Sequence, residues 1–155
     1  MAQLEDLTSR LAESHMASHH ARRRLSLLHQ LQDQEVALQA AYQYFASATE
    51  AQGAISYAGE WLLDNYHVVQ RAVRQIREDM PAGYYRQLPK LGRQLPQPGA
   101  SSLEGYPRIY ALAREVIRYC ESHLDLDRVT RFVQAYQKVA PLTMGELWAL
   151  PTMLR

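Results

Sequence analysis

Carboxylates are the residues of this sequence most able to bind a metal or act in catalysis, but their spacing favours structural roles. Asp125-Leu126-Asp127 spells the acidic D-x-D triplet with which sugar-nucleotide transferases hold a divalent metal on a diphosphate. Here the triplet precedes an amphipathic helical pattern with no strand before it, so helix capping by Asp125 or Asp127 is favoured over metal binding. Glu60 and Asp64 stand four residues apart, which is ordinary on a solvated helix face. We therefore predict no catalytic carboxylate.

Histidine, serine and glycine give no stronger indication of chemistry. His15 and His19 have the i,i+4 spacing that can place two imidazoles on one metal, but no H-E-x-x-H motif accompanies them, so solvated histidines are favoured and no metal site is predicted. Ser56 lies outside any nucleophile elbow. The glycines have neither P-loop nor G-x-G-x-x-G spacing, which argues against a phosphate-binding loop.

Aromatic and basic residues after a helix-ending proline form the better candidate site. Tyr84-Tyr85-Arg86 follows Pro81, where rings are less committed to a helical core. The cations of Arg86, Lys90 and Arg108 can pair with acidic groups nearby. We predict that Tyr84, Tyr85, Arg86, Lys90 and Arg108 bind a sugar chain or a partner protein. Three further aromatic residues are predicted to be buried structural anchors: Trp61, Tyr66 and Trp148.

Composition indicates one globular helical chain. The sequence has 155 residues, of which 47% are apolar and 21% charged. A net charge of +1 removes the general electrostatic case for nucleic acid or an anionic membrane, and Arg22-Arg23-Arg24 is interpreted as a solvated run. Cys120, the single cysteine, lies in an apolar helical stripe and is predicted to be buried. Neither a transmembrane span nor a signal peptide is expected.

Apolar periodicity predicts an all-α fold. Helical patterns cover approximately 2–18, 25–49, 56–80, 107–120 and 127–137, and a last helix follows Thr143, which forms a capping box with Glu146. Pro151 is expected to kink this helix or cut it short. We predict an irregular bundle of about five or six helices, with no strand pair and with one long loop rich in proline and glycine.

The domain organisation follows from the same pattern. We predict one helical domain over residues 1–155, divided into a loosely attached segment 1–24, a first helical half 25–80, a loop 81–105 and a second helical half 106–155. Helices are not expected within 81–105, whose second part, 92–102, is predicted to be a mobile linker. The last helix is expected to be truncated, as in a fragment of a longer protein.

Several phrases of the sequence resemble one known family, the cyclic β-1,2-glucan synthases. They occur in the family's order over roughly residues 25 to 155. Gly59 stands where the family is expected to have alanine. The matching phrases are Gly59–Asn65, Tyr66–Val69, Ile76–Asp79, Tyr84–Leu91, Gly105–Ala113, Phe132–Gln137 and Pro141–Pro151.

The resemblance implies a parent enzyme that builds and cyclises glucose chains from UDP-glucose with a divalent metal, at the cytoplasmic face of the bacterial inner membrane. The matching region lies near the N-terminus of that enzyme and outside its catalytic modules. This implies a non-catalytic helical module without a cofactor of its own, whose partners are the remaining domains and the β-1,2-glucan. The alternative is a freestanding helical protein-interaction module, and nucleic acid is not an expected partner.

Overall fold

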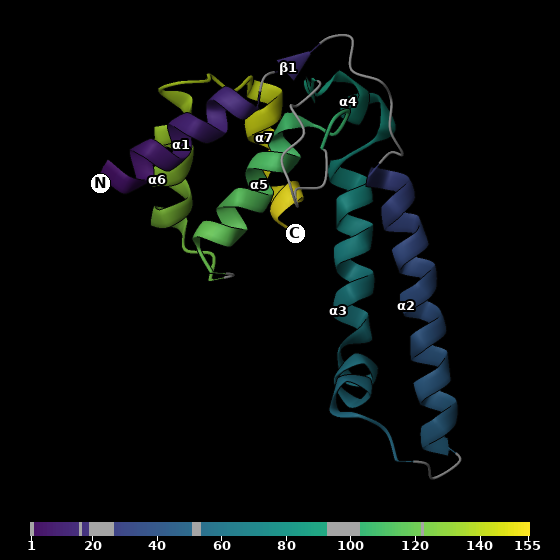
Figure 1. Ribbon diagram of the computed structural model, residues 1–155. Helices are drawn as coiled ribbons and strands as arrows, with labels where there is room; N and C mark the ends of the chain where they lie inside the picture. Colours follow the sequence, from purple (N-terminus) through teal and green to yellow (C-terminus); the bar gives the residue numbers. More distant parts are fainter. Residues whose placement is uncertain (1, 16, 19–26, 51–53, 93–102, 122) are drawn as a thin grey trace. The chain divides into compact units, whose positions relative to one another are not determined.

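A computed structural model describes residues 2–15, 17–18, 27–50, 54–92, 103–121 and 123–155. In this described part the chain forms seven helices and two strands of two residues each (Figure 1). The predicted all-α class is confirmed. The chain divides into two compact units, one formed by residues 25–81 and the other by residues 1–24 together with 82–155.

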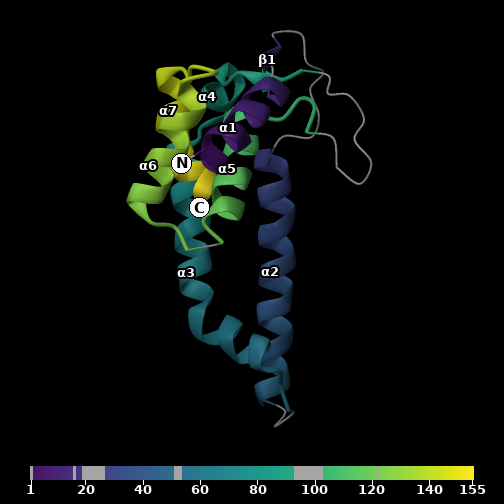
Figure 2. The ribbon, with the colours of Figure 1, turned by 60° about the vertical axis from the view of Figure 1, so that its left-hand side comes forward.

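The unit of residues 25–81 is a hairpin of two long helices. Helices α2 (Leu27–Glu50) and α3 (Tyr57–Asp79) run side by side in opposite directions (Figures 1 and 2). Ser56 caps α3, as predicted, by accepting a hydrogen bond from the Gly59 amide, and the helix ends at the predicted place before Pro81. Apolar residues at steps of three and four along α3 supply the face that meets α2.

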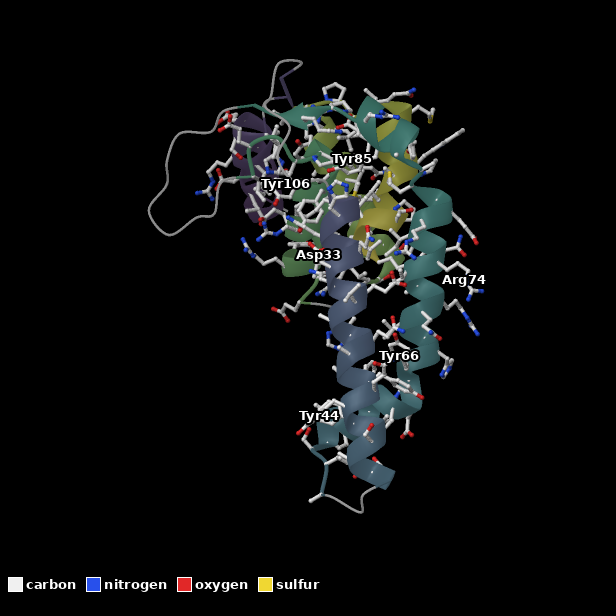
Figure 3. All side chains as sticks on the ribbon, turned by 90° about the vertical axis from the view of Figure 1, so that its right-hand side faces the viewer. Asp33, Tyr44, Tyr66, Arg74, Tyr85 and Tyr106 are labelled. Carbon is white, nitrogen blue, oxygen red and sulfur yellow. The ribbon has the colours of Figure 1, made fainter. Side chains whose placement is uncertain are left out.

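Aromatic contacts and one ion pair connect the two helices of this hairpin. The rings of Tyr42 and Tyr66 are stacked with their centroids 4.4 Å apart, so Tyr66, a predicted anchor, lies between the helices (Figure 3). Further along, the Arg77 guanidinium donates to the Glu35 carboxylate. Both side chains of this pair are partly exposed, so it orients the helices more than it stabilises them.

The second unit contains the other five helices of the described residues. They are α1 (Ala2–Ser14), α4 (Ala82–Gln87), α5 (Arg108–Tyr119), α6 (Leu126–Gln137) and α7 (Met144–Leu154). Helix α1 packs on α6, and α5 packs on α7. The core of this unit comes mainly from α5 and α6, with Ile109, Leu112, Val116, Phe132 and Tyr136 fully buried.

Predicted helix signals in this unit are confirmed. Asp125 caps α6 by accepting from the Asp127 amide, and the capping box of Thr143 and Glu146 is present at α7. Cys120 follows α5 and is buried, which agrees with its predicted structural role.

The stretch 81–105 differs from the prediction. Helix α4 occupies Ala82–Gln87, where no helix was expected. The physical reason is that Pro81 precedes the helix, where a missing N–H does no harm, and the next proline comes only at Pro89. Part of the predicted linker, 93–102, lies outside the described residues.

A short strand pair also departs from the prediction. Strands β1 (Ala17–Ser18) and β2 (Lys90–Leu91) are antiparallel. Beyond β2, the Leu91 amide donates to the Tyr106 carbonyl, and the Arg108 amide donates to the Pro89 carbonyl. Such two-residue pairings have no side-chain alternation, so the sequence pattern could not indicate them.

Helix α7 continues past Pro151 to Leu154, so of the two effects expected of Pro151 the shortening does not occur. Two predictions about tryptophans need correction. Trp61 and Trp148, predicted to be buried anchors, are 51% and 74% exposed. Because more than half of each ring is exposed, truncating either one would leave no enclosed cavity.

The close approach of Phe45 to Gly59 gives the first testable prediction. A Cβ at Gly59 would lie 2.8 Å from Phe45 Cδ1, and the overpacking outweighs the helix propensity that alanine adds. We expect Gly59→Ala to destabilise the chain by roughly 1–2 kcal/mol in urea unfolding. In a Phe45→Leu background the same change should be neutral or stabilising, and an equal loss in both backgrounds would contradict the steric explanation.

Candidate functional site

The five predicted binding residues lie on neighbouring elements of one unit. Tyr84, Tyr85 and Arg86 are in α4, Lys90 is in β2, and Arg108 begins α5. The bridge between Lys90 and Pro107 joins β2 to the start of α5. Tyr85 and Tyr106 are labelled at this end of the unit in Figure 3.

Lys90 closes the carboxyl end of α4. Its Nζ donates to the carbonyl oxygens of Tyr85 and Leu88, at 2.6 and 2.9 Å, and lies 4.5 Å from the centre of the buried Tyr85 ring. A cation at a helix carboxyl end meets the negative end of the helix dipole. Burial lowers the pKa of Lys90 to about 8. The ammonium group therefore has partners within the unit rather than a free surface.

Tyr84 and Arg86 face different surroundings within α4. The Tyr84 hydroxyl donates to the Gly145 carbonyl in α7, and burial raises the pKa of Tyr84. The Arg86 side chain is exposed, and its Nε donates to the Ala82 carbonyl at 3.2 Å. Of the five predicted binding residues, Arg86 presents its side chain most openly to an external ligand.

Arg108 forms a forked ion pair with Glu146. Its Nε lies 2.8 Å from Glu146 Oε1 and its Nη2 lies 2.6 Å from Oε2, while Nη2 also donates to the Pro141 carbonyl. The Glu146 side chain has no exposed surface. Hydrogen bonding to Glu146 raises the pKa of Arg108. The guanidinium, predicted to face a ligand, thus binds a carboxylate inside its own unit.

The same carboxylate completes the cap of α7. Glu146 Oε2 accepts hydrogen bonds from the amide and the hydroxyl of Thr143, and the Thr143 hydroxyl in turn accepts from the Glu146 amide at 3.2 Å. The capping box therefore holds the carboxylate in the orientation that Arg108 requires. The capping box and a pairing of Arg108 with an acidic group were both predicted, but the sequence did not indicate that Glu146 is that group.

A buried histidine lies beside a buried tyrosine in the same unit. His15 Nδ1 is 3.4 Å from the Tyr136 hydroxyl oxygen. Burial, and secondarily the positive charge of Arg108, lowers the pKa of His15 to about 4, so the imidazole is neutral at pH 7. Burial raises the pKa of Tyr136 to about 12. His15 was expected to be solvated, and this expectation is wrong, because α1 and α6 pack together around it. Its neighbour in the sequence argument, His19, lies outside the described residues.

The arrangement gives the polar groups structural partners. Tyr84, Lys90, Arg108 and Glu146 all make hydrogen bonds within the unit. Among the residues that the structure describes, no three His, Cys, Asp or Glu side chains converge as metal ligands. Within the same ranges, no helix combines the length and apolar character needed to cross a membrane.

The Arg108–Glu146 pair gives the second testable prediction. Glu146→Gln would leave buried donors of Arg108 and Thr143 without a charged acceptor, and we expect a loss of roughly 3–5 kcal/mol in unfolding free energy. The control is Glu115→Gln, which removes an exposed pair with Arg118 and should cost less than about 1 kcal/mol. Equal effects of the two variants would contradict a structural role for Glu146.

His15 gives the third testable prediction, which concerns pH. Its folded-state pKa of about 4 lies below the unfolded value of 6.5, so the unfolded chain binds more protons between these values. Stability should therefore fall as the pH drops from 6.5, by roughly 2 kcal/mol at pH 5. Denaturant unfolding of His15→Gln should lack this slope, whereas His29→Gln, at an exposed position, should keep it. A wild-type slope in the His15 variant would disprove the assignment.

Comparisons with known proteins connect the chain to one enzyme. Over 116 residues, 74% of its length, the chain is 40% identical to the cyclic β-(1,2)-glucan synthase NdvB of Rhizobium meliloti (strain 1021). The chain spans only 4% of the length of that relative. No protein-family model and no solved structure matches the chain. The resemblance to this family is therefore confirmed, and the chain is related to a short segment of a cyclic β-1,2-glucan synthase.

Proposed function

We propose that this chain is a non-catalytic helical module of a cyclic β-1,2-glucan synthase-like enzyme. The observation that carries the proposal is the 40% identity to NdvB, confined to 4% of that enzyme's length. A segment so small leaves the synthase chemistry to the rest of the polypeptide. The module's role is then to position the catalytic parts or to guide the growing glucan.

The contacts of the predicted binding residues support a structural role. The Arg108 guanidinium binds Glu146, the Lys90 ammonium binds carbonyl oxygens at α4, and the Tyr84 hydroxyl binds Gly145. Catalytic acids and metal ligands need free groups that converge on a cleft. Polar groups that are bonded inside the fold instead hold the helices of the module in a fixed arrangement, against which other domains can pack.

The wider proposal follows from the family. UDP-glucose and a divalent metal belong to the catalytic parts of the parent enzyme, and this module holds neither. The remaining domains are its partners, and they place it at the bacterial inner membrane. A contact with the β-1,2-glucan falls most readily on exposed groups such as Arg86 and Trp61.

The alternative function is a freestanding protein-interaction module. Exposed apolar side chains favour it, including Tyr57, Trp61 and Trp148. Both functions require a partner, but the alternative places that partner on a separate polypeptide. The two functions are distinguished by whether this chain restores glucan synthesis when it is placed in a synthase.

A replacement experiment tests the proposed function. In the Rhizobium meliloti synthase, the matched segment is deleted or replaced by this chain, and cyclic glucan formed from UDP-glucose is measured. We expect deletion to lower the glucan yield at least tenfold and this chain to restore most of it, because the module positions the catalytic parts. An unrelated helical domain of equal length is the control.

Two outcomes would contradict the proposal. A deletion that leaves glucan synthesis unchanged would show that the segment has no role in the enzyme. Equal restoration by the unrelated domain would show that only a spacer is needed. Failure of this chain to restore synthesis, although the enzyme accumulates normally, would favour the freestanding alternative.

A further inference from the structure

Helix α7 presents an uncharged face to its surroundings. Glu146 is the single charged residue of this helix, and it is fully buried. Trp148, in contrast, is 74% exposed, and Met144 is exposed as well. A helix that is apolar on all sides is normally covered on all sides. Helix α5 packs on one side of α7, and the exposed residues of α7 are Met144, Trp148 and Pro151.

This open face continues into a groove between α6 and α7. The α6–α7 groove has a volume of about 610 Å³. Thr130, Gln134 and Gln137 add neutral polar groups, and Asp125, which caps α6, adds a charge at the start of that helix. Leu126 is 79% exposed although it lines the groove. The apolar lining is formed mainly by Leu124, Leu126, Val133, Leu147, Leu150 and Leu154.

The lining identifies the chemistry of the occupant. Sugar rings are bound by aromatic faces and clustered polar groups, and the described lining contains no aromatic ring. Phosphates and nucleotides need cations or exposed amides, whereas the charged group present is the carboxylate of Asp125. Leucine and valine side chains between two helices instead match the apolar face of a third helix.

The dimensions of the groove argue for an occupant on the same polypeptide. Helix α6 has 12 residues and α7 has 11, which gives a length of about 18 Å at 1.5 Å per residue. Two packed helices are about 20 Å wide, so the footprint is about 350 Å² on each side. Stable free complexes bury about 800 Å² on each partner. A contact this small can still form when both partners belong to one polypeptide, because the connection gives a high local concentration.

We propose that the α6–α7 groove binds the apolar face of a helix from another segment of the same synthase polypeptide. This rests on the proposed function and extends it by naming the docking surface and the chemistry of its partner. The 4% share of NdvB that the chain matches means that such an enzyme contains ample further sequence to supply the helix. The small footprint argues against a second copy of this chain as the occupant.

Photo-crosslinking in the replacement enzyme tests the proposal. p-Benzoylphenylalanine is placed at position 126, in the groove, or at position 131 as control, since Arg131 is exposed on α6 and lies outside the groove lining. Crosslinked peptides are identified by mass spectrometry. We expect position 126 to crosslink within one polypeptide to a segment with apolar residues at helical spacing, at least fivefold more than position 131.

The other outcomes overturn the groove assignment. They are a crosslink from position 126 to a second copy, equal yields at the two positions, or no crosslink. Glucan synthesis by the same enzyme is measured separately. If the enzyme makes glucan but gives no crosslink, only the groove assignment is rejected. If it crosslinks but makes no glucan, only the proposed function is rejected, and if it does neither, both are rejected.

Sedimentation of the isolated full chain provides a second measurement. We expect a monomer at about 100 μM, because the footprint is too small for a free dimer. Leu126→Glu should leave both the sedimentation and the melting temperature unchanged, since this side chain is exposed. A dimer that dissociates in the Leu126→Glu variant would overturn the choice of occupant.

Discussion

The buried carboxylate of Glu146 is the group on which the unit of residues 1–24 and 82–155 most depends. It accepts two hydrogen bonds from Arg108 and two from Thr143, so one side chain joins the start of α5 to the start of α7. Tyr84 adds α4 to the same place through the Gly145 carbonyl. Because a buried charge without partners is costly, the cap, the ion pair and the packing of α5 on α7 stabilise one another.

The hairpin of α2 and α3 is held together in a different way. No residue of α2 with a described side chain is fully buried, and α3 buries only Gly59, Leu62 and Val73 among its described residues. Its contacts are one seam of apolar and aromatic side chains, which includes the Tyr42–Tyr66 stack, and the partly exposed Arg77–Glu35 pair. Two helices that share one seam gain little burial, so this hairpin is expected to open locally at a lower free energy than the other unit.

Local signals predicted much of the fold, and long-range contacts account for what was missed. Ser56, Asp125 and Thr143 were assigned as caps because a cap depends on residues within one turn. The Arg108–Glu146 pair joins residues 38 apart, and the contact of His15 with Tyr136 joins residues 121 apart. Trp61 and Trp148 were predicted to be buried because large aromatic rings usually lie in the core, but the sequence could not show whether another helix covers them.

The unit of residues 1–24 and 82–155 has an unusual distribution of polar and apolar side chains. In an independent protein, charged groups normally face water and apolar groups lie inside. Here Glu146, His15 and most of Arg108 are inside, whereas Trp148, Met144 and Leu126 are outside. The inner polar network fixes α7, and the outer face of α7 remains apolar. A helix with an uncovered apolar face is stabilised when another helix packs against it, and this would be the physical basis of the proposed module.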